Sequence, residues 1–342
     1  MTTHTQFPPS QPTQAQTGAV RNFLDRHFLN FNSREVVAAA RAYESHIDDG
    51  GRMMVTLGGA MSTARIGRSL SRMIRENKVH AITCTGANLE EDLFVLLAAD
   101  EYMPCPNWQD LTAADEKKLC EQGLNRVTDI CIPESVMRQI EQALVQRWEQ
   151  ACDKGQRCLP SEFLFDILRS GELAKHYQSP VEESWMMAAA EADLPVYTPG
   201  WEDSSTGNFF TSLTIQGKIP HHQCVKTGTE QMAHLVDWYL DQSSQNISDR
   251  GIGFFQIGGG IAGDFSICAV PLIIQDLKRR DIPMWDYFCQ ISDAITSYGG
   301  YSGAVPNEKI TWGKLDVHTP KFMIQSDATI IAPLIFAYVL GD

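Results

Sequence analysis

The sequence lacks the paired cysteines and the long apolar runs that mark secreted scaffolds and membrane proteins. Its nine cysteines fall at irregular positions without a C-x-x-C pair, which argues against a zinc module and a disulfide framework. No stretch approaches the roughly 18 apolar residues that would span a bilayer. The polar opening of the chain resembles neither a signal peptide nor a transit peptide. These absences predict a soluble, cytoplasmic protein with reduced thiols.

Positive charge is also scarce. The chain has 28 Lys and Arg against 42 Asp and Glu, a net charge of −14. This balance makes nucleic acids and anionic membrane surfaces poor partners and favours cationic ligands. With 342 residues and 43% hydrophobic content, the chain can bury a substantial core. We expect a disordered polar tail over residues 1–18 and a single large domain over residues 19–342.

A repeated pattern along the chain predicts the fold class. A short apolar run is followed by small residues and then by an amphipathic helix, which is typical of a parallel sheet covered by helices. Ligands of open α/β sheets bind where the carboxyl ends of the strands converge, so the turns after these runs are candidate binding segments. The four runs are residues 53–57, 80–83, 253–257 and 322–325, followed by turns at 58–59, 84–87, 258–260 and 326–328.

Periodicity and turn residues assign several other segments. Helices are expected over 20–47, with a cap at Asn32 and Ser33, over 62–75, from about residue 89, and over 106–154. Strands are expected over 194–197 and 315–317. Residues 201–208 are expected to form a polar loop, and residues 329–340 form an apolar segment.

Two small-residue turns are candidates for cofactor binding. The Gly258-Gly259-Gly260 turn allows close backbone approach to a ligand, and the amides of the following helix are suited to a pyrophosphate. The full G-x-G-x-x-G fingerprint is absent, and such a triplet is often only a tight turn. Glu90 and Glu91 follow the turn at 84–87, where carboxylates either cap a helix or bind ribose hydroxyls.

Lys314 is a candidate nucleophile. It lies in Thr311-Trp312-Gly313-Lys314, and a lysine becomes nucleophilic when desolvation or a nearby cation lowers its pKa. Trp312 is suited to supply the desolvation or to hold an ammonium group by cation–π attraction, with Glu308 as the opposite charge. The alternative is a solvent-facing lysine beside a packing tryptophan.

Other polar clusters indicate surface structure. Adjacent His221 and His222 cannot easily share one metal ion, and Cys224 has no matching second pair, so no metal site is predicted. Glu202 and Asp203 are interpreted as turn formers, with cation binding as the alternative.

Six segments resemble the deoxyhypusine synthase family, especially its bacterial homologues, over residues 20–338. Each is short, but six in register make a chance match improbable. They are LGGAMSTARIG (57–67), CTGANLEEDLF (84–94), YTPGWEDSSTGNFF (197–210), GGG (258–260), GGYSGAVPNEKITWGK (299–314) and SDATIIAPL (326–334).

The resemblance implies a doubly wound, Rossmann-like α/β fold with a mostly parallel sheet and helices on both faces. It also implies a homotetramer with active sites at subunit interfaces that bind NAD and spermidine. In the implied reaction, hydride passes to NAD from the carbon beside the secondary amine, and a lysine captures the resulting imine with loss of diaminopropane. The aminobutyl group then passes to an acceptor amine, and hydride returns. Lys314 stands at the position of the imine-forming lysine.

The resemblance further implies which residues surround each ligand. The NAD site would be lined by Met61, Ser62, Thr63, Ala64, Arg65, Thr85, Gly86, Ala87, Glu91, Asp203, Gly259, Asp293, Ala294, Asp327 and Ala328. The polyamine would be surrounded by Glu90, Asn208, Asp264, Gly299, Gly300, Tyr301, Glu308 and Trp312, with Lys314 among them.

The chain departs from the family pattern at four positions. The family usually has lysine at the position of Gly263 and His or Asn at that of Asp264, and the eukaryotic enzymes carry aspartates where Asn208 and Tyr301 stand. Asp264 is interpreted as restoring one negative charge. Because bacteria generally lack the translation factor that the eukaryotic enzyme modifies, the acceptor is either a small amine such as putrescine or agmatine, or a protein lysine. Two alternatives remain open: cleavage of the polyamine without an acceptor, and a non-catalytic protein that binds polyamine or NAD.

Overall fold

A six-stranded parallel sheet forms the centre of the molecule. The computed structural model describes residues 18–244, 250–296 and 299–342, so the expected tail lies outside the described residues except for Gly18. Every neighbouring pair of strands in the sheet runs parallel, which confirms the predicted fold class. The strands are β1 (Arg52–Leu57), β2 (Ala81–Cys84), β6 (Val196–Tyr197), β7 (Ile252–Ile257), β8 (Tyr287–Ser292) and β9 (Lys321–Gln325).

The order of the strands creates one switch point. Across the sheet the order is β6-β2-β1-β7-β8-β9. The chain therefore steps outward from β1 through β2 to β6, then returns beside β1 and steps outward through β7, β8 and β9. In a doubly wound sheet of this order, the connections on the two sides of the β1–β7 boundary diverge and leave a crevice at the carboxyl ends of these two strands.

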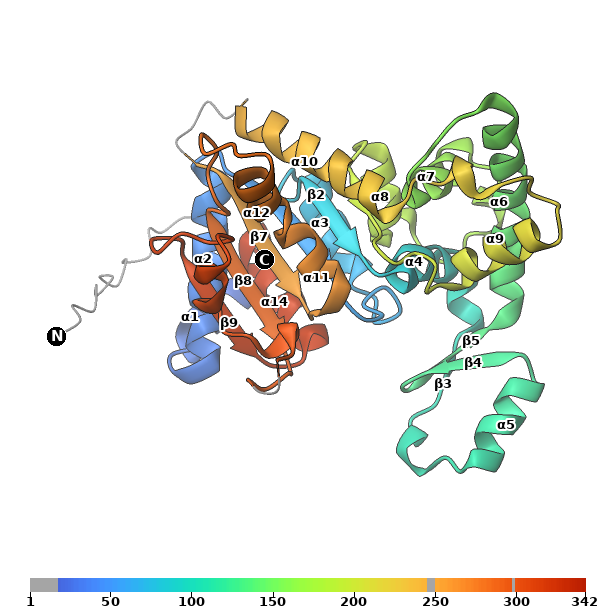
Figure 1. Cartoon of the computed structure of the whole chain (residues 1–342). Coiled ribbons are helices and arrows are strands. Elements are labelled where there is room, and N and C mark those ends of the chain that lie inside the picture. Colours follow the sequence, from blue (N-terminus) through green and yellow to red (C-terminus); the bar gives the residue numbers. More distant parts are fainter. Residues whose placement is uncertain (1–17, 245–249, 297–298) are drawn as a thin grey trace.

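Helices cover both faces of the sheet (Figure 1). On one face, α2 (Phe31–Asp48) and α14 (Ala328–Leu340) pack with Met53 and Val55 of β1. On the other face, α10 (Gly228–Ser244) and α11 (Gly260–Ile267) pack with Met54 of β1. Successive residues of a strand point to opposite faces, so a strand buried on both sides is apolar nearly throughout. The other helices are α1 (Ala19–His27), α3 (Gly67–Arg75), α4 (Gly86–Ala98), α6 (Glu134–Lys154), α7 (Pro160–Ser170), α8 (Trp185–Glu191), α9 (Ser205–Ile215), α12 (Ala269–Pro271) and α13 (Glu308–Thr311).

An arm projects from this body at the lower right of Figure 1. It contains α5 (Ala113–Glu121) and a three-stranded sheet of β3 (Met103–Pro104), β4 (Leu124–Val127) and β5 (Ile130–Pro133). The prediction of helix over 106–154 holds for α5 and for residues 134–154, and it was wrong where β4 and β5 lie. The two longer strands have four residues each and are only partly buried, and such short segments carry too little alternation to outweigh the charged helical pattern around them.

Four other expectations need correction. The helix expected over 20–47 is two helices, and α2 starts at Asn30 as N-cap rather than at Asn32 and Ser33. The helix expected from residue 62 starts only at Gly67, because residues 59–66 form turns in which Arg65 has a φ of 64°. The predicted strand at 315–317 is only an isolated bridge from Leu315 to Trp285. The second half of the expected loop over 201–208 belongs to α9.

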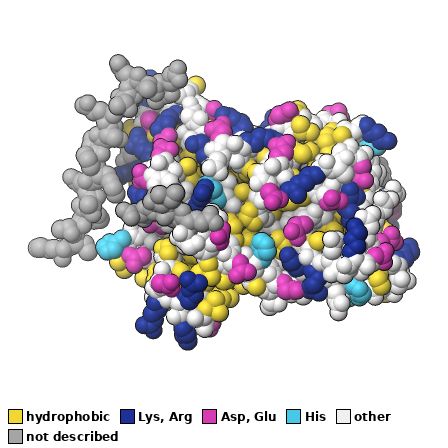
Figure 2. Space-filling model, turned by 90° about the horizontal axis from the view of Figure 1, so that it is seen from above, with side chains coloured by type: hydrophobic (Ala, Val, Ile, Leu, Met, Phe, Trp, Pro, Cys, Tyr) yellow, Lys and Arg dark blue, Asp and Glu magenta, His cyan; other side chains and the backbone are white. Residues whose placement is uncertain are grey.

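The described surface carries both signs of charge. Figure 2 shows Lys and Arg interspersed with Asp and Glu over the face seen from above. Within residues 18–244, 250–296 and 299–342, no helix has both the length and the apolar content needed to cross a membrane. The same residues contain no group of three or more His, Cys, Asp or Glu side chains placed to hold a metal ion.

Candidate active site at the carboxyl edge of the sheet

Lys314 lies just after α13 and is buried, with 8% of its surface exposed. Its Nζ donates a hydrogen bond to Asp264 Oδ1 of α11 at 3.1 Å. The same Nζ lies 5.5 Å from the centroid of the Tyr301 ring. A solvent-facing lysine, the alternative from the sequence, is therefore not what the structure shows.

A pocket of about 540 Å³ opens beside this amine. Trp312 lines the pocket but is 62% exposed, and the aromatic ring that faces the amine is that of Tyr301. The sequence offered no local signal for this, because Tyr301 precedes Lys314 by 13 residues. The predicted polyamine residues that line this pocket with Lys314 are Asp264, Gly299, Gly300, Tyr301, Glu308 and Trp312.

Tyr301 is held in place by a hydrogen bond to the central sheet. Its hydroxyl donates to Gln256 Oε1 at 2.8 Å, and Gln256 is fully buried in β7. Burial raises the pKa of Tyr301 well above its usual value, so the phenol stays neutral and remains a donor. A Cβ atom on Gly263 would lie 2.7 Å from Gln256 Oε1 and 3.1 Å from the Tyr301 ring. Because glycine has no Cβ atom, Gly263 leaves room for the Tyr301–Gln256 pair.

Two glycine turns meet at the switch point between β1 and β7. A Cβ atom on Gly58 would lie 2.9 Å from Gly259 O, and one on Gly259 would overlap Ser302. Gly59 and Gly260 have φ values of 60° and 66°, and a Cβ on either would meet nothing within 4 Å. The turns therefore bring backbone close together on one side and leave open space on the other, as a ligand cradle requires.

The segment after β1 is tied to the start of α4. Asn88 accepts a hydrogen bond from Ser62 N and donates to the carbonyl oxygens of residues 57–59. Thr85 is the N-cap of α4 and donates to Gly59 O at 2.7 Å. Thr63 donates to Glu91 Oε2 at 2.8 Å. Burial raises the pKa of Glu91 to about 7, and the Thr63 hydrogen bond opposes this shift. The predicted NAD residues Met61, Ser62, Thr63, Ala64, Arg65, Thr85, Gly86, Ala87 and Glu91 thus belong to one connected region.

Glu90 and Asn208 lie in a different pocket from Lys314. This second pocket has a volume of about 570 Å³ and also contains Glu91, Glu134 and Glu141. Glu90 is buried, and its two carboxylate oxygens accept hydrogen bonds from the backbone amides of residues 205 and 206 at 3.0 and 2.8 Å. Burial raises the pKa of Glu90, and these two hydrogen bonds oppose the shift. Within one chain, the structure therefore divides the predicted polyamine residues between two pockets.

The remaining predicted cofactor residues lie next to the ends of strands and helices, where the three aspartates among them are exposed. Asp203 lies just before α9, and Asp293 and Ala294 follow β8. Asp327 is the N-cap of α14 and accepts from Thr329 N at 2.7 Å, while Ala328 begins that helix. Asp293 and Asp327 thus follow neighbouring strands at the same edge as Gly259.

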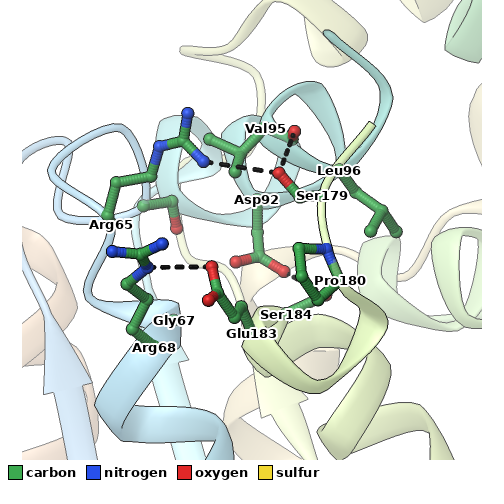
Figure 3. Close-up of a pocket in the computed structure, with 11 residues that line it drawn as sticks. Arg65, Gly67, Arg68, Asp92, Val95, Leu96, Ser179, Pro180, Glu183 and Ser184 are labelled. Carbon is green, nitrogen blue, oxygen red and sulfur yellow. Dashed lines mark hydrogen bonds and ion pairs between the residues drawn. The ribbon is translucent and has the colours of Figure 1, made fainter. Parts of the chain in front are cut away.

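A smaller hollow beside Arg65 does not extend the site. Figure 3 shows Arg65 reaching toward Ser179, and Arg68 paired with Glu183. Asp92, which the sequence did not single out, accepts from Ser184 Oγ in this hollow, and burial raises its pKa to about 6. The cavity volume is about 10 Å³, room for about one water molecule. We assign the Arg68–Glu183 pair and the Asp92–Ser184 hydrogen bond to structural support beside the turn at 59–66.

Sequence comparison identifies the family. A family model described as deoxyhypusine synthase matches residues 25–339. The chain belongs to the deoxyhypusine synthase family. A deoxyhypusine synthase-like protein of Nostoc sp. is 29% identical over 336 residues, which cover 95% of this chain and 82% of the relative. A deoxyhypusine synthase-like protein of Cyanothece sp. is 27% identical over 330 residues, covering 95% and 80%.

Comparison with solved structures supports the fold. A crystal structure from Entamoeba histolytica, assigned as a deoxyhypusine synthase, aligns with a TM-score of 0.54 and 13% identity, covering 92% of this chain and 90% of that chain. Membership in the deoxyhypusine synthase family implies that the protein is a transferase.

Proposed function

We propose that this protein is an NAD-dependent aminoalkyl transferase that acts on spermidine or a related polyamine through an imine on Lys314. The observation that carries the proposal is the position of the Lys314 amine. It is buried, bonded to Asp264 and faced by Tyr301 in a pocket beside the carboxyl edge of the sheet. A lysine amine that faces a pocket from a buried position is placed to form a covalent bond with a carbon of a bound substrate.

The crevice between β1 and β7 fits a dinucleotide. Glycine turns that leave open space at the switch point admit a pyrophosphate, and carboxylates nearby are suited to ribose hydroxyls. Residues 61–65, Thr85, Glu91 and Gly259 would hold NAD there, with the aspartates after β8 and β9 at the same edge. The chemistry supplied by bound NAD is acceptance and later return of one hydride.

Residues of the lysine pocket perform the transfer. The amine of Lys314 would attack the carbon of the oxidised polyamine, a new C–N bond would form, and diaminopropane would leave with the original amine nitrogen. The aminobutyl group is then bound to Lys314 as an imine. An acceptor amine would attack the same carbon and Lys314 would depart, which leaves the aminobutyl group on the acceptor as an imine, the species that a hydride donor held at the NAD site would reduce. Asp264 and Glu308 would hold ammonium groups of the donor, and Trp312 would contact it by cation–π attraction.

The two-pocket arrangement supports an oligomer. The lysine pocket contains Asp264 and Glu308 against Lys314, which is little excess negative charge for a polycation. The second pocket adds Glu90, Glu91 and Asn208. We infer that a second subunit brings its acidic pocket to the lysine pocket of the first, in a homotetramer with a cytoplasmic location. A small amine or a protein lysine would act as acceptor.

A trapping experiment tests the proposed function. The enzyme is incubated with NAD and spermidine, reduced with borohydride and digested. The mass of the peptide that contains Lys314 is then measured by mass spectrometry. We expect an aminobutyl adduct that requires both NAD and spermidine and is absent from Lys314→Arg. Addition of putrescine or agmatine should remove the adduct and yield a new polyamine. Release of aminobutyraldehyde alone would show cleavage without an acceptor. NAD binding without any adduct or label exchange would show a binding protein.

A further inference from the structure

Three cysteines and a histidine lie together at the end of α6 that is remote from the acidic second pocket. Cys152 is in the last turn of α6, Cys158 lies between α6 and α7, and His221 and Cys224 belong to the segment between α9 and α10. All nine cysteines of the chain are free thiols in this structure. The sequence showed no second pair for Cys224, because its neighbours in space are far away along the chain.

The thiols of Cys152 and Cys224 are in contact. The Cys152 sulfur lies 3.8 Å from Nδ1 and 3.8 Å from O of His221, three residues before Cys224. Burial raises the pKa of the Cys224 thiol to about 12, and a side-chain hydrogen bond with Cys152 adds to this shift, whereas Cys158 contributes only a more distant charge. A disulfide joins two sulfur atoms at about 2 Å, so thiols already in contact need only a small side-chain rotation to reach that distance.

The two thiols differ in their access to solvent. Cys152 is half-buried, whereas only 1% of the surface of Cys224 is exposed. An oxidant from solution therefore reaches Cys152 first. Because the thiolate is the attacking species in disulfide exchange, the raised pKa of Cys224 also makes Cys152 the thiol that reacts first. The same raised pKa makes Cys224 a poor leaving group, which protects a disulfide from reduction once it has formed.

We propose that Cys152 and Cys224 are a redox pair, which a low-molecular-weight disulfide such as oxidised glutathione converts into a disulfide bond between α6 and the segment 219–226. Cys152 loses its proton to solvent and attacks one sulfur of the oxidant, whose S–S bond breaks and releases one thiolate. Cys224 then loses its proton, attacks the Cys152 sulfur of the mixed disulfide, and the second thiolate leaves. The two cysteines lose two protons and two electrons in total, and the oxidant becomes two thiols. This inference is independent of the proposed function.

The disulfide would restrict the packing that supports the acidic pocket. Trp148 of α6 packs edge-on against Phe210 of α9, with ring centroids 4.9 Å apart, and the His222 ring lies 5.8 Å from the Phe210 ring. The first residues of α9 supply the amides that bind Glu90. A bond between α6 and the segment 219–226 would limit the relative movement of these elements. Closing a long stretch of chain also removes conformational freedom from the unfolded state, so the oxidised protein should be the more stable form.

A redox titration with peptide mapping tests the pair. The full chain is equilibrated in mixtures of reduced and oxidised glutathione, blocked with N-ethylmaleimide, digested without reduction and analysed by mass spectrometry. We expect a cross-linked peptide pair that joins Cys152 to Cys224. Cys120 is exposed and shows that the oxidant is active, because it should form a mixed disulfide with glutathione. Cys289 is fully buried and should remain a thiol.

Serine variants separate this pair from the third cysteine. Cys152→Ser and Cys224→Ser should each abolish the cross-link and the upward shift of the urea midpoint on oxidation, whereas Cys158→Ser should keep both. A cross-link of Cys158 to either thiol in place of the expected one would overturn the inference. So would the absence of a cross-link when Cys120 is fully modified. Because the mapping uses the wild-type chain, a variant that fails to fold does not remove the test.

Discussion

At Lys314, one carboxylate determines how the amine is held. Asp264 accepts its hydrogen bond, and half of the Asp264 side chain remains exposed to the pocket. The carboxylate can therefore bind the lysine or an incoming ammonium group. Under the proposed function, this one acidic side chain would hold Lys314 in the empty pocket and an ammonium group of the donor when the donor is bound.

Asp264→Asn is expected to weaken polyamine binding. The substitution keeps the shape of the side chain and removes the charge, and a partly exposed ion pair contributes about 1 kcal/mol, or roughly fivefold in affinity. Calorimetric titration with spermidine checks this. Asp193→Asn is the matched control, because Asp193 is 88% exposed and pairs with Arg169 outside the pocket. Equal affinities of Asp264→Asn and the wild type would rule out donor binding by Asp264.

Glu91 makes stability depend on pH. Its pKa is about 7 in the folded chain, above the ordinary value for glutamate, so the folded state binds the proton more tightly. The protein therefore loses stability as the pH rises from the pKa of Glu91 in the unfolded chain through its pKa in the folded chain. Between pH 5 and pH 8, this group should lower the free energy of unfolding of the wild type by about 2 kcal/mol. The Glu91→Gln variant should lack this decrease.

Urea denaturation at pH 5, 6.5 and 8 measures this slope. Glu149→Gln, on the exposed side of α6, is the control and should follow the wild type. A Glu91→Gln slope that matches the wild type would contradict the assignment of a raised pKa in the folded state.

At the scale of elements, the start of α11 is fitted to the loop that carries Tyr301. Gly263 lies against Gln256 and Tyr301, and Ser302 Oγ accepts from Gly260 N at 3.2 Å. The helix, β7 and the loop therefore depend on one another. This packing fixes the Tyr301 ring, whose centroid lies 5.0 Å from Lys309 Nζ and 5.5 Å from Lys314 Nζ.

Gly263→Ala should displace Tyr301 although alanine favours a helix. The added methyl would lie closer to Gln256 than a Cβ contact allows, and overpacking costs about 1–3 kcal/mol against a gain in helix propensity of about 1 kcal/mol. We expect lower stability, measured by chemical denaturation, and weaker trapping on Lys314. Gly228→Ala, where the methyl meets nothing within 4 Å, is the control. Unchanged trapping in Gly263→Ala would show that the Tyr301 position is not needed.

For the whole molecule, two pockets on one chain predict a shared site. If the acidic pocket of one subunit completes the lysine pocket of another, an inactive Lys314→Ala chain and an inactive Glu91→Gln chain should restore activity when they assemble together. If the two chains pair at random across a two-fold interface, about half of the pairs contain one chain of each kind. Each such pair has one intact site out of two, so we expect about a quarter of wild-type activity.

Activity of co-expressed chains carrying different tags checks this assembly. Each chain expressed alone is the control and should remain inactive. A mixed preparation that forms the oligomer but stays inactive would place all the required residues on one chain.

The sequence by itself determined the architecture and the family, and it predicted Lys314 as the nucleophile. Apolar runs followed by small residues indicated the parallel sheet, since strands buried on both faces must be apolar and their carboxyl ends must turn tightly. Six segments in register predicted the family, which the family model confirms, and they placed Lys314 at the position of its imine-forming lysine. Only the tertiary structure showed that Lys309 is buried beside Lys314, that the Tyr301 ring lies near both amines, and that Glu90 and Asn208 occupy a second pocket. These features depend on contacts between β7, β8, α11 and the loop at 299–304. The residues next to a charged or polar side chain in the sequence do not show which distant residues will cover it and exclude water.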